Sequence, residues 1–162
     1  MPKFIFTELV NPLDRVETAR LGAGTGAANF LTDKEVGKFV KLVAESRYDL
    51  CAVGNEIEGR IVAIETASQD NYTIGSVQRE GRFEVTFDGL QGTPGTGVIA
   101  LGDYVVTGTP VPKDTALVFT TPAKVCKATA AGNTLNHKWR VISLGSAGTG
   151  AVGTTGLIER VS

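Results

Sequence analysis

Apolar and polar residues alternate over short stretches of this chain, a pattern typical of β-strands. The clearest case is Arg82-Phe83-Glu84-Val85-Thr86-Phe87, in which Phe83, Val85 and Phe87 share one face. A period of two over such a run predicts a half-buried antiparallel strand. Other short runs rich in β-branched or aromatic residues are separated by glycine and other turn residues, at 39–43, 48–53, 60–65, 72–77, 103–107, 116–119, 124–128, 138–142 and 157–161.

About ten short strands with frequent turn signals predict an all-β fold, a sandwich or a small antiparallel barrel. The strands do not alternate with helices, so we expect no parallel sheet with a cofactor crevice. Thr32 and Glu35 have the spacing of a capping box, which predicts one helical turn before the first core strand. The body of the protein is therefore expected to span residues 32–162.

Residues 1–31 differ from the body and are predicted to be an extended N-terminal arm. A short helix over 12–20 is the alternative, with Asn11 as N-cap, Pro12 at the first helical position and Gly22 as the stop. An extended apolar segment gains partners by adding to the edge of a neighbouring sheet. We therefore expect the arm to carry protein-interface residues; the other interpretation is a first strand in the body's own sheet. The predicted anchors are Phe4, Ile5, Phe6, Leu9 and Val10.

The charge balance and hydropathy pattern exclude several classes of partner. The chain has 16 Lys and Arg against 17 Asp and Glu, a formal net charge of −1. Proteins that neutralise phosphates need a basic excess or stripe, so nucleic-acid binding is not expected. No apolar run approaches the roughly 20 residues that span a bilayer, and the N-terminus lacks the apolar core of a signal peptide. No membrane association is predicted.

The reactive residues do not form a recognisable catalytic set. Cys51 and Cys126 lie far apart in strand-like segments and are expected to be buried free thiols. His137, the only histidine, is expected to be an exposed surface residue. A catalytic triad with Ser143 or Ser146 as nucleophile is the alternative, although neither serine lies in a nucleophile-elbow sequence.

Other short motifs give only weak signals for metals or cofactors. The run 22–27 has the glycines of a dinucleotide fingerprint but not the strand before it or the helix after it. Asp114-Thr115-Ala116 is similar to an aspartic-protease triplet but has alanine in place of glycine. The sequence therefore predicts no metal, no cofactor and no enzyme. Four carboxylates are interpreted as solvated surface in preference to a calcium site: Asp33, Glu35, Glu56 and Glu58.

Four short segments carry a resemblance to a known family: V-G-K-F-V-K-L at 36–42, I-E-G-R-I-V-A at 57–63, A-L-G-D-Y-V at 100–105 and K-W-R-V-I-S-L at 138–144. Taken in order, they resemble segments of the capsid decoration (cement) proteins of tailed bacteriophages. Each motif is short, so the resemblance depends on their order and spacing between residues 33 and 144. The long segment before Thr32, the insertion 89–97 and the glycine-rich tail depart from the simplest pattern of the family.

This resemblance implies a β-barrel or β-tulip-like body that binds the major capsid protein on the outer surface of the phage head. It implies self-association, as a homotrimer or a dimer, and a role in stabilising the shell against internal DNA pressure. The chain would then reach the virion surface from the host cytoplasm during assembly. Two other functions stay open: a small ligand- or glycan-binding barrel, and a hydrolase that depends on His137.

Overall fold

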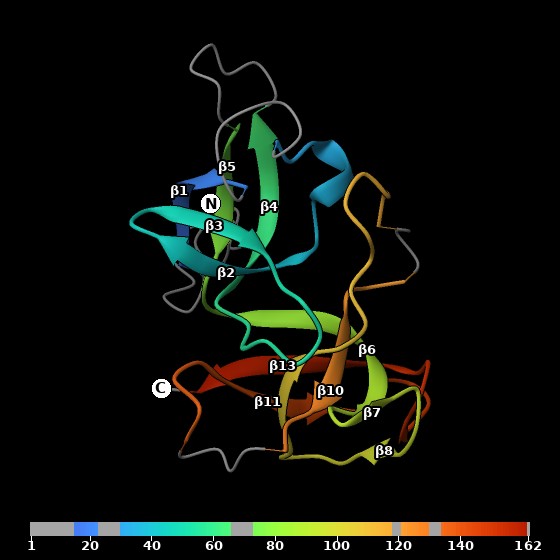
Figure 1. The fold of residues 1–162 in the computed structure, drawn as a ribbon. Helices are drawn as coiled ribbons and strands as arrows, with labels where there is room; N and C mark the ends of the chain where they lie inside the picture. Colours follow the sequence, from blue (N-terminus) through green and yellow to red (C-terminus); the bar gives the residue numbers. More distant parts are fainter. Residues whose placement is uncertain (1–14, 23–29, 66–72, 118–120, 130–133, 162) are drawn as a thin grey trace, which may run out of the picture.

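The protein was analysed as a computed structural model, which describes residues 15–22, 30–65, 73–117, 121–129 and 134–161. These ranges contain β-strands and one short 3₁₀ helix, η2 (Asp33–Glu35), and no α-helix. The all-β prediction is therefore confirmed. Figure 1 shows that the strands form two groups, one above the other.

The N-terminal group of strands is a closed five-stranded barrel, here called barrel 1. The strands follow one another in the order β1-β3-β2-β4-β5, and all neighbours are antiparallel except β1 and β3. β1 closes the ring because it pairs with β5 along its whole length and with β3 on the other side. The strands are β1 (Val16–Leu21), β2 (Phe39–Ala44), β3 (Arg47–Leu50), β4 (Gly59–Glu65) and β5 (Thr73–Gln78).

The C-terminal strands form a second ring, here called barrel 2. Its sheet has the order β10-β9-β11-β13-β6-β7, and a parallel pairing of β10 with β6 closes five of the strands on themselves. A separate two-stranded sheet joins β8 to β12. The strands are β6 (Arg82–Leu90), β7 (Thr93–Pro94), β8 (Val98–Ile99), β9 (Tyr104–Thr107), β10 (Lys124–Lys127), β11 (Lys138–Ser143), β12 (Gly150–Ala151) and β13 (Thr155–Val161).

The alternation predicted for residues 82–87 is present in β6. Phe83, Val85 and Phe87 are fully buried, and Arg82 and Glu84 are exposed. Thr86 is the exception: its predicted place is the polar face, but it is buried where β6 pairs with β10 on one side and β13 on the other.

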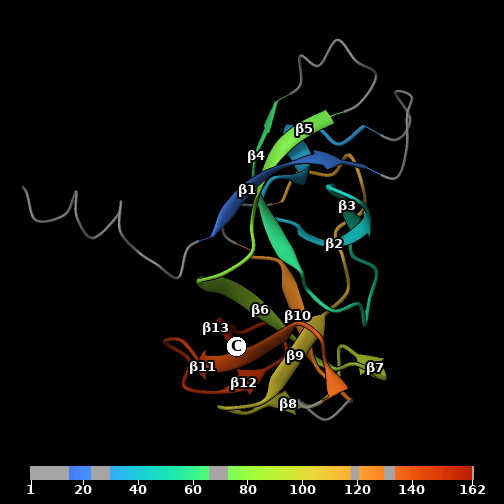
Figure 2. The same ribbon diagram turned by 90° about the vertical axis from the view of Figure 1, so that its left-hand side faces the viewer.

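Each barrel has its own apolar core, and a residue of barrel 1 packs into the core of barrel 2. Phe39 of barrel 1 belongs to the buried cluster of barrel 2, where its ring lies 6.1 Å from the Phe83 ring. Phe83 in turn stacks on Trp139 at 4.4 Å. Figure 2 shows barrel 1 above barrel 2, with the chain passing from β5 in the upper group to β6 in the lower one. The two barrels are therefore joined by an aromatic contact at their junction.

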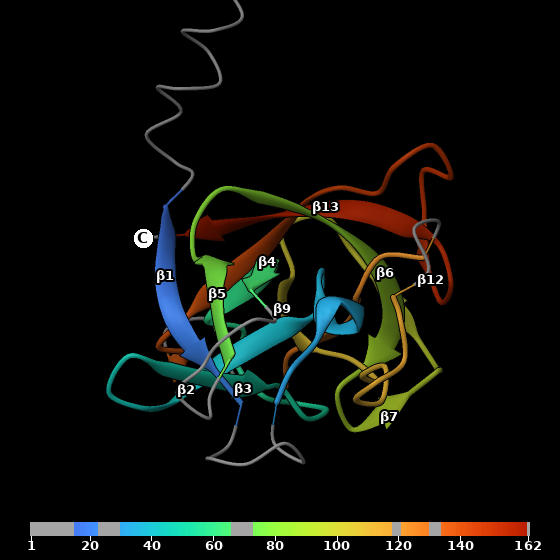
Figure 3. The same ribbon diagram turned by 90° about the horizontal axis from the view of Figure 1, so that it is seen from above.

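Two expectations for the N-terminal region are corrected. The short helix over 12–20 is wrong for residues 16–20, which belong to β1. The boundary between arm and body is also not at residue 31, because Ala19 and Leu21 of β1 lie in the core of barrel 1. Figure 3 shows β1 beside β5 in that barrel. The predicted helical turn after Thr32 is confirmed as η2, with both hydrogen bonds of the capping box.

Candidate functional site

The loop between β3 and β4 of barrel 1 forms part of the contact with barrel 2. It lies against barrel 2, where the indole nitrogen of Trp139 donates to the carbonyl oxygen of Ile57 at 2.8 Å. Two backbone hydrogen bonds link the same loop to β9, from Gly54 to Thr107 at 2.8 Å and from Thr107 to Asn55 at 3.0 Å. Ile57 and Trp139 are fully buried. The junction between the barrels is thus both packed and hydrogen-bonded.

A charged cluster lies beside this loop, centred on Arg160 at the end of β13. The guanidinium group donates to the carbonyl oxygens of Arg79 at 2.8 Å and Glu58 at 3.4 Å. It also lies 2.9 Å from Nδ1 of His137. An arginine only donates hydrogen bonds, so this contact makes Nδ1 the acceptor and places the imidazole proton on Nε2. Arg160 therefore holds together segments from both barrels.

His137 is half-buried in this cluster, which corrects the expectation of an exposed histidine. Its Nε2 lies 3.6 Å from a carboxylate oxygen of Glu58, and its backbone N–H donates to Glu56 at 2.9 Å. Burial lowers the pKa of His137, and the nearby Arg160 lowers it further, whereas Glu58 opposes the shift. The ring is consequently favoured in its neutral form, as a structural acceptor for Arg160.

The serines considered as nucleophiles do not join His137. Ser143 lies at the opposite end of β11 from His137. The six residue steps of extended chain from His137 to Ser143 span roughly 20 Å. The Ser143 hydroxyl accepts a hydrogen bond from the backbone N–H of Gly145 instead. Ser146 lies in the exposed segment just beyond it. The triad alternative is therefore wrong in this structure.

A buried ion pair attaches the long β9–β10 loop of barrel 2 to barrel 1. Lys38 donates to Glu35 at 3.3 Å and to the carbonyl oxygen of Pro112 at 2.8 Å. Glu35 also accepts from the backbone N–H groups of Asp114 and Thr32, each at 2.6 Å. The Glu35 side chain has no solvent exposure, so its interpretation as solvated surface is wrong.

The environment of Glu35 favours the ionised carboxylate. Burial raises the pKa of Glu35, but the hydrogen bonds from Thr32, Asp114 and Lys38 outweigh burial and hold the pKa below its usual value. Asp114 itself lies on an exposed turn with a left-handed backbone (φ 63°) and pairs with Lys113. The Asp-Thr-Ala triplet is thus part of a turn, and its Asp114 backbone N–H donates to the Glu35 carboxylate of the ion pair.

Both cysteines are buried free thiols, as predicted. The Cys51 thiol donates to the carbonyl oxygen of Glu56 at 3.6 Å, and the Cys126 thiol donates to that of Asp88 at 3.6 Å. Burial raises the pKa of each thiol to about 11. Because only the thiolate is a nucleophile, these thiols are unreactive near neutral pH.

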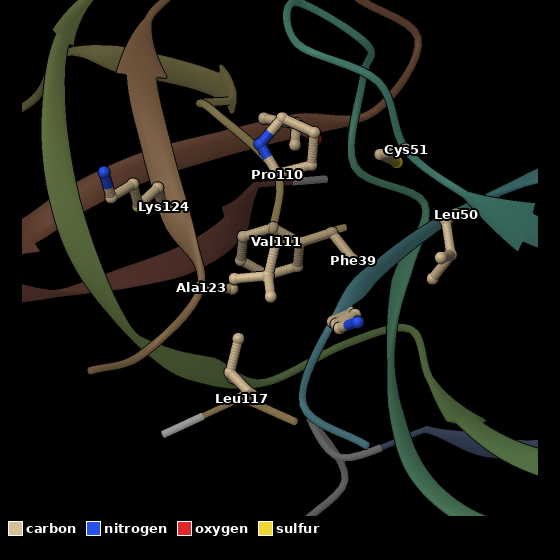
Figure 4. Close-up of a pocket in the computed structure, with 10 residues that line it drawn as sticks. Phe39, Leu50, Cys51, Pro110, Val111, Leu117, Ala123 and Lys124 are labelled. Atoms are coloured by element: carbon tan, nitrogen blue, oxygen red, sulfur yellow. The ribbon is translucent and has the colours of Figure 1, made fainter. Parts of the chain in front are cut away.

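A small apolar cavity lies beneath the β9–β10 loop, between the barrels. Figure 4 shows Phe39, Val111, Leu117 and Ala123 around it, with Cys51 at one side. Buried Thr107 also lines it, and the Thr107 hydroxyl lacks a partner at hydrogen-bonding distance. The free space is about that of one water molecule, well below a typical small-molecule site.

Large apolar side chains are exposed at several places in the described ranges. They occur on β1 and β2 of barrel 1 and around β8 and β12 of barrel 2. The set comprises Val16, Val36, Leu42, Val43, Val53, Leu90, Val98, Leu101, Val152 and Leu157. The predicted arm anchors lie outside the described residues: Phe4, Ile5, Phe6, Leu9 and Val10.

The comparisons with known proteins give no relative for this chain. No family model, no curated protein and no solved structure matches it. In the described ranges, no group of three or more His, Cys, Asp or Glu side chains is placed to hold a metal ion. No helix in those ranges has the length and apolar character needed to cross a membrane. A function for this chain is therefore inferred from its own residues.

Proposed function

We propose that this chain is a structural protein of a phage virion, a decoration protein that binds the outer surface of the head. It would contact the major capsid protein, self-associate as a homotrimer or dimer, and stabilise the shell against DNA pressure. The observation that carries this proposal is a division of roles among the described side chains. Buried reactive groups hold the two barrels together, whereas large apolar groups face solvent.

The first part of the support comes from how the reactive side chains are used. His137 accepts from Arg160, Glu35 pairs with Lys38, and both cysteines are buried with raised pKa values. Each of these groups has a structural partner, and the cavity beside Cys51 has room for about one water molecule. This arrangement suits a protein that acts through its surface.

The second part of the support is the mechanical character of the fold. Two closed barrels leave few unpaired strand edges, which limits uncontrolled association. The packed contact among Phe39, Phe83 and Trp139, together with the Arg160 cluster, ties the barrels at two places. A protein that braces a shell needs to keep its shape when neighbours pull on it.

The four segments that resemble decoration proteins are distributed over both barrels. Two of them overlap β2 and β4 of barrel 1, and the other two overlap β9 and β11 of barrel 2. The resemblance therefore involves one pair of neighbouring strands in each barrel, β2 with β4 and β9 with β11. The apolar residues of the N-terminal sequence, Phe4 to Val10, are the proposed contacts with the capsid.

Co-sedimentation with phage shells tests this function. The chain is mixed with expanded and with unexpanded capsids, and the bound fraction is measured after pelleting. We expect saturable binding to expanded shells and higher resistance of those shells to heat. A variant lacking residues 1–12 should bind more weakly while its unfolding midpoint stays unchanged. An absence of binding by the folded full-length chain would contradict the proposal.

A further inference from the structure

Two segments without any charged residue meet at one end of barrel 2. Residues 89–102 and 141–158 contain no Asp, Glu, Lys, Arg or His. They come together in the sheet of β8 and β12, with Val98 opposite Ala151 and Ile99 opposite Gly150. Figures 1 and 2 place this sheet at the end of barrel 2 that faces away from barrel 1. We call this surface the neutral pole, defined by Leu90, Val98, Ala100, Leu101 and Val152.

The neutral pole carries four of the ten exposed large apolar side chains of the described chain. Val98 and Leu101 are each 61% exposed, the highest values among its large apolar residues, and Val152 is 41% exposed. Leu90 packs over Gly97, because a Cβ atom built on that glycine would lie 2.7 Å from Leu90 Cγ. The apolar side chains thus continue from β6 across β8. Contiguous exposed apolar patches mark interaction sites.

Two threonine hydroxyls near the pole are occupied within the chain. The Thr96 hydroxyl donates to the carbonyl oxygen of Thr93 at 2.8 Å, and the Thr154 hydroxyl donates to that of Ala151 at 2.8 Å. Neither hydroxyl therefore requires a partner from outside. A face with satisfied hydroxyls loses little when water is removed from it.

The two carboxylates that flank residues 89–102 are paired. Asp103 accepts from the backbone N–H of Ala100 at 2.8 Å and pairs with Lys127 at 3.0 Å. Asp88 is 3% exposed and pairs with Lys124 at 3.4 Å. The pole consequently presents apolar side chains without adjacent unpaired carboxylates. Depletion of charge is the compositional mark of the centre of a protein interface.

We infer that the neutral pole is the surface through which copies of this chain associate with one another. In a dimer or a trimer, a patch on the symmetry axis meets the same patch of another copy, so any unpaired charge there would face a like charge. A patch without charge avoids this repulsion. A charged partner surface would instead lose its water against a face with no counter-charge. The occupant is therefore itself uncharged, and every copy of the chain carries such a surface.

This inference rests on the self-association that forms part of the proposed function, and it identifies the residues responsible. It can be tested without capsids. The mass of the purified chain is measured by light scattering over a wide concentration range, for the native protein and for Val98→Asp and Val98→Lys. We expect the native chain to exceed the 17.0 kDa of a monomer. Each variant should associate with itself at least about tenfold more weakly than the native chain, because like charges then meet.

Mixing the two charge variants distinguishes contact between copies at the pole from a general loss of association caused by the substitution. If copies meet at the pole, an equal mixture of Val98→Asp and Val98→Lys should associate more strongly than either alone. Leu42→Asp, at a residue 44% exposed on β2 of barrel 1, is the matched control and should leave association unchanged. Urea unfolding midpoints confirm that every variant is folded.

Any of the following outcomes would overturn the inference. The native chain could be a monomer at all concentrations, the mixture could associate no better than its components, or Leu42→Asp could weaken association as much as Val98→Asp. A monomer that still pellets with shells would contradict this inference and leave the decoration function standing. A chain that associates with itself but does not bind shells would contradict the decoration function and leave this inference standing. Loss of shell binding by Val98→Asp with unchanged mass would show that the pole faces the capsid.

Discussion

The junction between the barrels and the neutral pole are opposite in chemical character. At the junction the chain buries charges and pairs them: Lys38 with Glu35, and Arg160 with backbone carbonyls and His137. At the pole it has no charge and leaves Val98 and Leu101 in water. Buried pairs add little net stability, but removal of one partner leaves an uncompensated buried charge. The comparison indicates that the chain uses paired charges to fix its own shape, and we propose that it uses the uncharged surface for contact with neighbours.

The largest effect is expected from the aromatic contact of the junction. Trp139→Ala removes a fully buried indole and its hydrogen bond to Ile57, and should lower the free energy of unfolding by about 3–5 kcal/mol. The measurement is urea denaturation followed by circular dichroism. A loss below about 1 kcal/mol would show that the barrels do not depend on this contact.

The buried ion pair is expected to have the next largest effect. Lys38→Met leaves the Glu35 carboxylate buried without its counter-ion and should cost about 3 kcal/mol of unfolding free energy. The matched control is Lys113→Met, which breaks the more exposed pair with Asp114 and should cost less than about 1 kcal/mol. Equal losses in the two variants would contradict the distinction between buried and exposed pairs.

The junction should also make stability depend on pH. The pKa of His137 is lowered in the folded protein, so the unfolded chain binds its proton first as the pH falls. The stabilisation from neutral His137 is fully present above the unfolded pKa of 6.5 and is lost as the pH falls through the lower folded value. His137→Gln should therefore flatten the decline in unfolding free energy between pH 7 and 5. An unchanged slope would show that His137 does not cause this decline.

A second decline in the free energy of unfolding, at lower pH, is expected from the buried carboxylates. The pKa values of Glu35 and Asp88 are lowered because their hydrogen bonds outweigh burial. Their stabilisation is present above the unfolded values of 4.5 and 3.8 and is lost as the pH falls through the folded ones. Glu35→Gln should reduce this acid-side decline without changing the slope between pH 7 and 5.

The smallest effect is expected from the pole itself. Val98→Thr and Leu101→Ser replace exposed apolar groups and should change the unfolding free energy of dilute protein by less than about 0.5 kcal/mol. The same substitutions should reduce association in concentrated samples. A large loss of stability in dilute solution would mean that the pole is needed for the fold of each copy.

The local pattern of residues is enough to predict most strands and the first helical turn. The alternation over 82–87 predicts β6, and the spacing of Thr32 and Glu35 predicts η2. These features depend on residues close together in the chain, which is why a pattern reveals them. The capping box even locates Glu35, although nothing in the local pattern indicates that Lys38 and the backbone N–H of Asp114 bury it.

The division into two barrels is not predictable from those patterns. A strand has the same alternation whichever sheet it joins, and both ring closures depend on partners far apart in sequence, β1 with β5 and β6 with β10. The β1 segment V-E-T-A-R-L has its buried positions only in its second half, so its pattern also fits an arm or a helix. The burial of His137 is hidden for the same reason, because Arg160 and Glu58 reach it only in the folded chain.

The most direct test of the contrast between junction and pole is hydrogen–deuterium exchange at low and high protein concentration. We predict that association slows exchange at residues 97–102 and 150–153, which form the pole. Exchange at the junction, around residues 54–58 and 137–141, should be slow at both concentrations and unchanged between them. Protection that appears at the junction, with none at the pole, would contradict the account.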